Sequence, residues 1–318
     1  MFGERGLMLC GVAGPFLTPL RATTRFCAVF GHPVRHSASP AMQNAGLAAL
    51  GLNWRYLACE VHPDHLAAAI EGAKAMRFIG LNLTLPHKLL ALGMVDVLDE
   101  SAKMWGAVNT IRFEALGADG RWMSLSEVAA DDLTTLRSHG FNTDADALTR
   151  SLKEDLHCEP RGSRVLLLGA GGAGRAAAVK LAADGAAELF IANRTASKAE
   201  ELADEIRQRF PQTTVATGYP PGPVDLLINA TSLGLRMVDA MPLDVTTFRV
   251  SRARAVYDMI YTPAETPLLA AAKAAGCRVA NGFGMLLHQG ARALEIWTGR
   301  PSPLDPMRRA LKEQVYGS

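Results

Sequence analysis

The stretch Arg164-Val-Leu-Leu-Leu-Gly-Ala-Gly-Gly-Ala-Gly-Arg175 decides the fold of this chain. A short apolar strand runs into three glycines, Gly169, Gly171 and Gly174, and an alanine-rich helix follows. In such a turn the first glycine allows a tight bend, the second lets the backbone approach a pyrophosphate, and the third lets the helix pack on the strand. The helix N-terminus would offer free N–H groups to the phosphates. The pattern predicts a nucleotide site, although a merely tight turn remains the alternative.

The residues after the next apolar strand, 188–192, indicate which nucleotide is bound. An NAD site usually has an acidic residue here that bonds the ribose 2′-hydroxyl. This chain instead has Asn193-Arg194-Thr195, followed by Lys198. A guanidinium pairs with a 2′-phosphate, whereas a carboxylate would repel it, so the pattern favours NADP over NAD. A solvated helix start is a second interpretation, because Ser197 and Glu200 fit a capping box.

Composition describes a globular protein of two domains. The chain has 318 residues, with 49% hydrophobic and 20% charged residues and a formal net charge of +2. This charge gives no basic field of the kind that indicates nucleic acid or a membrane surface as a partner. Five cysteines are scattered without C-x-x-C spacing: Cys10, Cys27, Cys59, Cys158 and Cys277. We therefore expect reduced thiols in a cytoplasmic protein, without a disulfide framework or a zinc site.

Residues 1–24 are expected to form an N-terminal extension. Their apolar run from Leu7 to Leu17 faintly resembles a secretory signal, but glycines and Pro15 interrupt it. The run is too short to span a membrane, and no other stretch is a transmembrane candidate.

From residue 25 onward, expected strands and helices alternate, which predicts α/β layers with largely parallel sheets. Strands are expected at 26–30, 54–60, 78–83 and 108–113, and helices at 40–50, 65–76, 88–103 and 144–156. The polar segment 114–141 is expected to be an irregular loop or a short added helix. Residues 159–163, rich in turn formers, mark a domain boundary.

The second half has the order of a six-stranded, doubly wound Rossmann-type unit. Its strands are expected at 164–168, 188–192, 213–216, 225–229, 255–259 and 278–280, and its later helices at 197–210 and 267–275. Two further helices, 285–298 and 306–316, are expected to return and brace the first half. The predicted domains are therefore 25–150, completed by 285–318, and 151–284.

Polar side chains cluster at the element boundaries of the first half. Ser37 and Ser39 follow a strand, where capping is the alternative, with Ser39 as N-cap and Pro40 as the first helical residue. Asn82 and Thr84 share one parity and so one face of a strand.

Lys88 lies just beyond that strand, where open α/β sheets bind their ligands, although a lysine there is usually solvated. The runs Asn109-Thr110 and Asn142-Thr143-Asp144 are two more such clusters, with turn and cap roles as alternatives. The histidines have no metal-ligand spacing, so no metal site is expected; they are His32, His36, His62 and His65.

The order of the motifs resembles that of shikimate dehydrogenases, collinearly over about nine-tenths of the chain. The set is G-H-P-V-x-H-S-x-S-P, N-x-T-x-P-x-K, G-A-V-N-T, N-T-D, G-A-G-G-A-G-R, N-R-T, N-A-T-S, Y-D-M-x-Y and G-M-L-x-x-Q. The resemblance implies NADP-dependent reduction of 3-dehydroshikimate to shikimate, a step of chorismate and aromatic amino acid biosynthesis. It also implies a substrate-binding domain at 25–150, an NADP-binding domain at 151–284, and an active site in the cleft between them.

The resemblance assigns roles to individual residues, with Lys88 and Asp144 as the catalytic pair. The implied substrate-binding residues are Ser37, Ser39, Asn82, Thr84, Asn109, Tyr261 and Gln289. The implied cofactor-binding residues are Glu100, Gly169, Ala170, Gly171, Gly172, Ala173, Asn193, Arg194, Thr195, Lys198, Thr231, Ser232, Met259 and Gly282. A lysine ammonium can stabilise the negative charge that builds on a ketone oxygen and supply its proton. In the reverse direction the neutral lysine accepts a proton, so oxidation should rise with pH.

Three departures from the family pattern concern the site. Phe141 and Ala145 flank N-T-D where the family often has aspartate and glycine, the segment 114–141 is longer than usual, and Asn281 stands where an aspartate is common. A quinate or broad polyol-acid dehydrogenase is the nearest alternative, and a non-catalytic regulator that binds cofactor or shikimate is the alternative of another class. The sequence leaves open whether the chain forms a homodimer.

Overall fold

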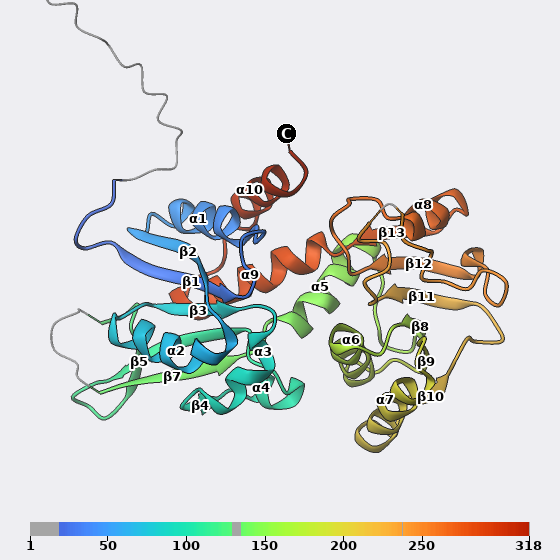
Figure 1. Ribbon diagram of the computed structural model, residues 1–318, viewed down its shortest axis with the longest axis horizontal. Coiled ribbons are helices and arrows are strands. Elements are labelled where there is room, and N and C mark those ends of the chain that lie inside the picture. The colour runs from blue at the N-terminus through green and yellow to red at the C-terminus, as the bar shows by residue number, and fades with distance from the viewer. Residues whose placement is uncertain (1–18, 129–134, 237, 318) are drawn as a thin grey trace, which may run out of the picture.

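The computed structural model describes residues 19–128, 135–236 and 238–317, so most of the expected extension 1–24, including Cys10, lies outside them. Figure 1 shows two halves side by side, each built on one β-sheet, with α5 (Asp144–Leu156) and α9 (Phe283–Thr298) running between them. The other four cysteines are free thiols. In the described part of the chain, no helix is long and apolar enough to cross a bilayer.

The sheet of the first half is mixed, so the expected largely parallel sheet is wrong here. Its order is β2-β1-β3-β5-β7-β4, with β6 paired to β5. The strands are β1 (Arg25–Gly31), β2 (Trp54–Glu60), β3 (Gly80–Leu83), β4 (Val97–Leu98), β5 (Thr110–Leu116), β6 (Trp122–Ser124) and β7 (Leu136–Phe141). β5 runs antiparallel to β3, β6 and β7, and a short turn joins it to β6.

The segment 114–141 is neither an irregular loop nor a helix in its described part. β5 extends into it as far as Leu116, a turn with Gly120 at φ +78° follows, and β6 and β7 pair with β5. Residues 129–134 lie outside the described part. The hairpin turn lies at the end of β5 opposite Thr110, which pairs with Phe141. The long segment therefore grows away from Asp144.

The helix expected over 88–103 is broken into several elements: α3 (His87–Leu90), the 3-10 turn η2 (Ala91–Gly93), β4 and α4 (Glu100–Trp105). Tertiary hydrogen bonds override the helical periodicity. Asp96 Oδ2 accepts the main-chain N–H of Ser138 at 2.7 Å and its hydroxyl at 2.8 Å, which ties β4 to β7. Asp99 then starts α4 by accepting the Ser101 N–H at 2.9 Å.

The second half contains the six-stranded, all-parallel sheet that the glycine turn predicted, in the order β10-β9-β8-β11-β12-β13. Its strands are β8 (Arg164–Leu168), β9 (Glu188–Ala192), β10 (Thr214–Thr217), β11 (Val224–Asn229), β12 (Ala253–Asp258) and β13 (Arg278–Asn281). Its helical elements are α6 (Gly172–Ala183), α7 (Ala196–Arg209), η3 (Val250–Arg252) and α8 (Pro267–Ala274). Both faces of the sheet are buried, in two apolar clusters.

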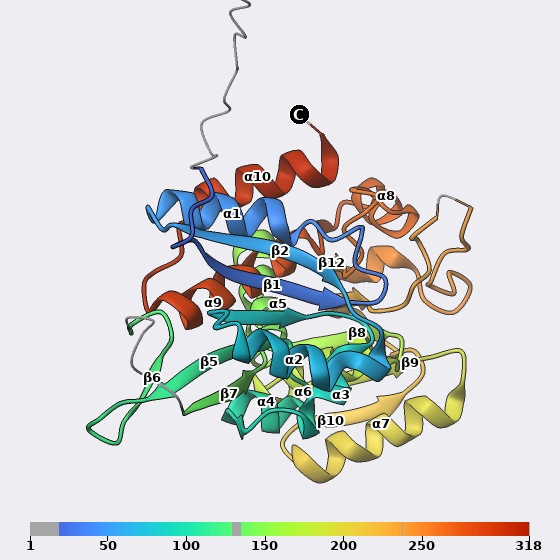
Figure 2. The ribbon, with the colours of Figure 1, turned by 60° about the vertical axis from the view of Figure 1, so that its left-hand side comes forward.

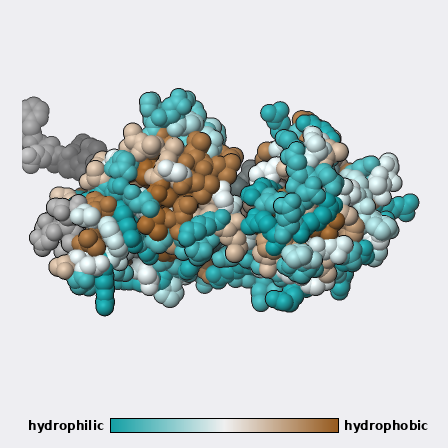
Figure 3. All heavy atoms as spheres, turned by 90° about the horizontal axis from the view of Figure 1, so that it is seen from below, coloured by the Kyte–Doolittle hydropathy of each residue, from teal (hydrophilic) through white to brown (hydrophobic). Residues whose placement is uncertain are grey.

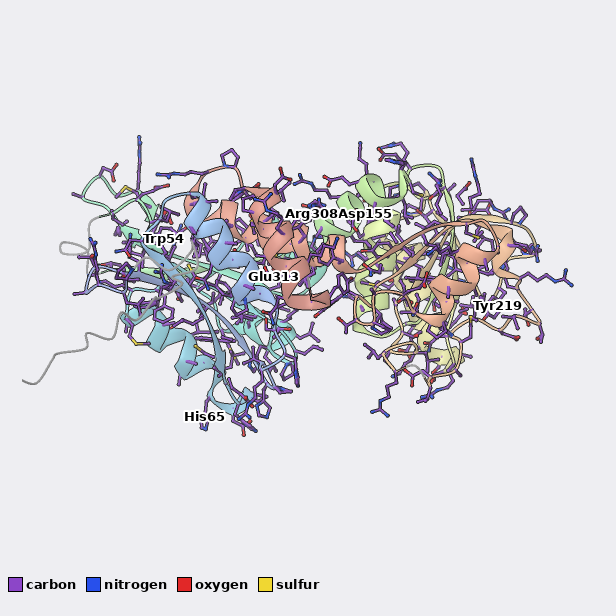
Figure 4. The ribbon with its side chains drawn as sticks, turned by 90° about the horizontal axis from the view of Figure 1, so that it is seen from above. Trp54, His65, Asp155, Tyr219, Arg308 and Glu313 are labelled. Atoms are coloured by element: carbon purple, nitrogen blue, oxygen red, sulfur yellow. The ribbon has the colours of Figure 1, made fainter. Side chains whose placement is uncertain are left out.

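The last two helices return to the first half, as expected. α10 (Leu304–Tyr316) packs on α1 (Ser39–Ala49), and α9 packs on α1 and α5. Trp297 of α9 is 1% exposed and donates its indole N–H to Ile111 O at 2.9 Å. Figure 2 shows α2 (Leu66–Ala75), which follows the turn η1 (Pro63–His65), on the opposite face of the sheet from α9. Arg308 of α10 lies 3.7 Å from Glu154 of α5, and Figure 4 labels Arg308 and the neighbouring Asp155 at the junction of the halves.

The C-terminus of α4 is anchored in the second half. Trp105 packs into the same apolar cluster as the residues of α6 and α7. Glu205 of α7 bonds both Arg175, at 2.7 Å, and Arg209, at 2.6 Å. Arg209 in turn donates to Met104 O at 2.9 Å. Cations therefore meet the free carbonyls at the end of α4, where the helix dipole favours them.

Candidate active site

Four segments that lie far apart in sequence meet at one edge of the first sheet. Ser37 and Ser39 follow the carboxyl end of β1, and Thr84 to Lys88 follow that of β3. Asn109 precedes β5, whose antiparallel direction brings its start to the same edge, and Asp144 follows the end of β7. The mixed topology thus gathers the polar clusters that the sequence singled out.

Lys88 and Asp144 form an ion pair at this edge. Lys88 Nζ lies 2.7 Å from Asp144 Oδ2, and the side chains are 31% and 19% exposed. Asp144 is the first residue of α5, and Asn142 Oδ1 accepts its main-chain N–H at 3.0 Å. The helix N-terminus suits a carboxylate. The neighbouring His87 is fully buried and its Nε2 lies 2.9 Å from Val61 O, which holds the start of α3 in place.

The surroundings of Lys88 are apolar on both sides along the chain. Leu85, Leu89 and Leu90 are the large hydrophobic residues exposed there. Seen from below, hydrophobic side chains gather on one face of the first half (Figure 3). Exposed leucines thus flank Lys88 in its own segment, and Asp144 is its hydrogen-bond partner.

A hydrogen-bonded network of buried, neutral side chains lies at the same edge of the sheet. The Tyr56 hydroxyl donates to Asn82 Oδ1 at 2.7 Å, and Asn82 Nδ2 donates to Thr110 Oγ1 at 3.0 Å. Thr110 donates to Asn109 Oδ1 at 3.0 Å, and Asn109 Nδ2 donates to Thr143 Oγ1 at 3.0 Å. Every residue of the network is at most 6% exposed. Burial raises the pKa of Tyr56 well above its usual value, so the phenol stays protonated.

The interpretation of Ser39 as the N-cap of this helix is wrong. The N-cap of α1 is Ala38, without a side-chain bond, so Ser39 is the first helical residue and Pro40 the second. Ser37 Oγ instead accepts the Ser39 N–H at 3.3 Å. Both serines stay partly exposed beside the edge.

The other expected substrate residues, Tyr261 and Gln289, are partly buried. Gln289 Nε2 donates to Leu286 O of its own helix at 2.9 Å. Asn281 Oδ1 accepts the N–H of Phe283 at the start of α9, at 3.0 Å, so this asparagine supports the helix that carries Gln289. Glu100 is 85% exposed and pairs with Lys103 at 2.6 Å.

The glycine turn of the second half has the geometry that a pyrophosphate needs. Gly169 has φ +104°, which only glycine adopts readily. A Cβ on Gly174 would lie 2.1 Å from Gly169 O, so the helix can pack this closely only without a side chain. Gly171 caps α6 and has open space where its Cβ would be. Asn193 Oδ1 accepts the Ala170 N–H at 3.0 Å and fixes the turn against the end of β9. Residues 169–173 therefore have a backbone geometry that could hold a phosphate.

The cations beside this glycine turn have the features of a 2′-phosphate clamp. Arg194 and Lys198 are exposed, and neither has an ion-pair partner among the described residues. The capping-box interpretation is wrong, because Thr195 is the N-cap of α7 and no side chain caps the helix. Glu200 instead pairs with Arg207 at 2.9 Å. Both cations stay available to an anion.

A third set of residues, at the ends of β11 and β12, is held by two buried polar side chains. Asn229 Oδ1 accepts the N–H of Thr231 at 3.0 Å, and its Nδ2 donates to Asp258 Oδ1 at 3.0 Å. Burial raises the pKa of Asp258. A Cβ on Gly282 would lie 2.2 Å from Met259 O, so these two segments touch through backbone. Thr231, Met259 and Gly282 are thereby brought to one edge, and Ser232 follows Thr231 on the exposed side.

Models of known families match three parts of the chain. They describe a shikimate dehydrogenase substrate-binding domain at 29–111, a shikimate/quinate 5-dehydrogenase at 151–238, and a shikimate 5′-dehydrogenase C-terminal domain at 282–312. The shikimate dehydrogenase (NADP(+)) of Geobacter metallireducens is 42% identical over 90% of this chain and 95% of its own length. The chain belongs to the shikimate dehydrogenase family.

Solved structures of relatives have the same two-sheet arrangement. Shikimate 5-dehydrogenase from Thermus thermophilus, in complex with NADP(H) and shikimate, has a TM-score of 0.74 and 35% identity, and covers 92% of this chain and 100% of that one. The ligand-free 5-ketofructose reductase of Gluconobacter sp. strain CHM43 has a TM-score of 0.76 and 36% identity, and covers 92% and 99%. The resemblance found in the motifs is thus confirmed.

Sequence reasoning did not assign roles to Tyr56, Thr143, Asn229 or Asp258. Thr143, Asn229 and Asp258 each stand in a motif that was quoted, so their positions carried a signal. Tyr56 had none, since a tyrosine within an apolar strand is indistinguishable from ordinary core.

The clamp interpretation predicts the outcome of Arg194→Ala. We expect the KM for NADP to rise about tenfold or more, the effect of losing a charge-assisted hydrogen bond, while the KM for NAD stays the same. Steady-state kinetics with both nucleotides measures this. Arg300→Ala, at another exposed arginine, is the matched control. An equal rise for NADP and NAD would contradict a contact with the 2′-phosphate.

Proposed function

We propose that the chain catalyses the reversible, NADP-dependent reduction of 3-dehydroshikimate to shikimate. The observation that carries this proposal is the ion pair of Lys88 Nζ and Asp144 Oδ2, 2.7 Å apart at the sheet edge where the polar clusters converge. Family membership at 42% identity supports the assignment of substrate and nucleotide.

Lys88 has the chemistry of the acid–base group. Its ammonium would stabilise negative charge on the ketone oxygen and donate the proton that forms the hydroxyl. In the oxidation direction the neutral amine would accept that proton. Asp144 keeps Nζ in place, and the exposed leucines beside Lys88 would help to exclude water from the reacting oxygen.

The proposed NADP site uses three groups of residues, and the bound nucleotide supplies the hydride. Gly169 to Ala173 would hold the pyrophosphate, Asn193 to Lys198 the ribose 2′-phosphate, and Thr231, Ser232, Met259 and Gly282 the nicotinamide end. Glu100 would approach the nucleotide from the first half. Residues 193–198 contain no carboxylate, and Arg194 and Lys198 have no ion-pair partner within the described ranges; both observations support NADP over NAD.

The proposed substrate site lies on the first half, formed by residues 25–150 and 285–318, and faces the nucleotide half at 151–284. The groups proposed to contact substrate hydroxyls and carboxylate are Ser37, Ser39, Thr84, Asn109, Tyr261 and Gln289. Asn82 supports them from behind, since both of its amide hydrogens are donated within the protein.

Initial rates of nucleotide reduction with shikimate or quinate, each with NADP or NAD, test the proposal. We expect fast turnover only with shikimate and NADP. Fast turnover with quinate or NAD would instead indicate a quinate or broad polyol-acid dehydrogenase. The likeness to a 5-ketofructose reductase makes a neutral polyol ketone the second candidate substrate, so NADPH oxidation with 5-ketofructose is a further assay. Turnover confined to that ketone would overturn the proposal.

A further inference from the structure

We infer that Tyr56, Asn82 and Thr110 are positioning residues that fix the side-chain amide of Asn109, so that Asn109 presents an N–H group, and not its carbonyl oxygen, to the ligand. This inference rests on the proposed function, because it concerns the same substrate site. The ligand atom that it assigns to Asn109 is an acceptor, such as a hydroxyl or carbonyl oxygen.

The first contact that fixes the orientation of these side-chain amides is with a main-chain carbonyl. Asn82 Nδ2 lies 3.2 Å from Asn109 O, and a carbonyl can only accept. The nitrogen of Asn82 must therefore face β5, and its Oδ1 must face Tyr56. Since Oδ1 cannot donate, the Tyr56 hydroxyl supplies the hydrogen of that 2.7 Å contact.

The direction of the next two bonds follows from this first contact. Asn82 Nδ2 also donates to Thr110 Oγ1 at 3.0 Å, so the threonine hydroxyl uses its own hydrogen elsewhere. That hydrogen points to Asn109 Oδ1, also at 3.0 Å. Thr110 thus requires the oxygen of the Asn109 amide, and not its nitrogen, on this side.

The second such contact is independent of the first and agrees with it. The main-chain N–H of Thr143 donates to Asn109 Oδ1 at 2.9 Å, and a main-chain N–H can only donate. Asn109 Nδ2 is therefore the remaining polar atom of this amide, and Thr143 Oγ1, which lies 3.0 Å from Nδ2 and 3.3 Å from Oδ1, accepts one of its hydrogens. Within the part of the chain described, no acceptor takes the second hydrogen. It is a donor held at the floor of the site, next to Thr143, the residue that precedes Asp144.

The test compares Thr110→Val, which keeps the shape but removes the hydroxyl, with Thr110→Ser, which keeps the hydroxyl. We expect the KM for shikimate to rise about tenfold in Thr110→Val and by no more than about twofold in Thr110→Ser. The KM for NADP should not change in either. Tyr56→Phe should resemble Thr110→Val, whereas Tyr257→Phe, which removes another buried phenol hydroxyl, is the matched control.

A double-mutant cycle separates positioning from general destabilisation. If Thr110 acts through Asn109, Thr110→Val should change the KM for shikimate by no more than about twofold in an Asn109→Ala background. A tenfold loss in both backgrounds would overturn the inference.

A second readout does not depend on activity. Hydrogen exchange of the Asn109 side-chain amide, followed by NMR of the whole chain, should be slow in the unaltered protein and in Thr110→Ser, and about tenfold faster in Thr110→Val. Equal exchange in all three would overturn the inference even if shikimate is turned over. Absence of shikimate turnover in the unaltered chain, with the exchange pattern as expected, would overturn the proposed function alone.

Discussion

Lys88→Ala is expected to lower kcat for shikimate oxidation by at least about 10³-fold, the combined contribution of a general acid–base group and of charge stabilisation at the reacting oxygen. Lys88 Nζ is the cation hydrogen-bonded to Asp144 at the sheet edge, and alanine can neither move the proton nor stabilise the charge. NADP affinity should stay the same, because the residues proposed to bind its phosphates belong to the other half of the protein. Stopped assays for turnover and fluorescence titration with NADPH measure the two quantities.

The matched control is Lys273→Ala, since Lys273 is an exposed lysine paired with Glu265 at 3.2 Å, far from the sheet edge in sequence and fold. It should retain the kcat of the unaltered chain. A Lys88→Ala protein that keeps kcat within about tenfold would contradict the acid–base role. Parallel loss of NADPH binding would instead indicate that the variant is misfolded, which circular dichroism would reveal.

Glu114→Gln is expected to lower the free energy of unfolding by about 3–5 kcal/mol, the range found when one partner of a buried ion pair is removed. Glu114 is 1% exposed and bonds three groups: Arg112, Arg137 at 2.6 Å and His139 at 3.1 Å. Glutamine would leave two guanidinium groups next to each other without their common counter-charge. Urea unfolding at neutral pH measures the change.

Glu265→Gln is the matched control, because it removes the charge of a 53% exposed carboxylate and should change stability by less than about 0.5 kcal/mol. A loss below about 1 kcal/mol in Glu114→Gln would show that the arginines find other partners.

The same residue gives stability a defined dependence on pH. Burial alone would raise the pKa of Glu114, but the hydrogen bonds from His139, Arg112 and Arg137 outweigh it and lower the pKa from 4.5 to about 2. A carboxyl whose pKa is lower in the folded state stabilises the protein above its unfolded pKa. This contribution should therefore be complete above pH 4.5 and be lost as the pH falls towards 2. The Glu114→Gln protein should lack this part of the acid transition.

The second half could be predicted closely because its elements are determined by local sequence. Strands such as 164–168 and 188–192 are buried on both faces and stand out as apolar runs between turn residues. Helix α5 was predicted with both of its ends at the observed residues. The glycine turn requires a positive φ angle, which Gly169 adopts.

The first half was predicted less well because its strands depend on partners far along the chain. β7 contains Arg137 and His139, which are polar in the sequence and become partly buried only when Glu114 of β5 binds them. The break of the helix expected over 88–103 depends on Ser138, which lies 42 residues beyond Asp96. Neither interaction can be predicted from the hydrophobic periodicity of the sequence.

The candidate site, too, could be predicted from the sequence only in part. Lys88 and Asp144 could be singled out by their motifs, yet their contact spans 56 positions and became evident only in the structure. Asn109 was found by the family pattern, but the direction of its amide depends on contacts with Thr110 and Thr143 that form only in the folded chain.

The network from Tyr56 to Thr143 consists of phenol, amide and hydroxyl groups, none of which titrates in the ordinary working range, and burial raises the pKa of Tyr56 further. These side chains therefore keep the same arrangement of hydrogen-bond donors and acceptors in mildly acidic and mildly alkaline solution. In the proposed mechanism, the charge that changes during turnover belongs to Lys88. The proposed mechanism thus assigns substrate recognition and proton transfer to different atoms, so a change of pH should slow the reaction without changing the preferred substrate.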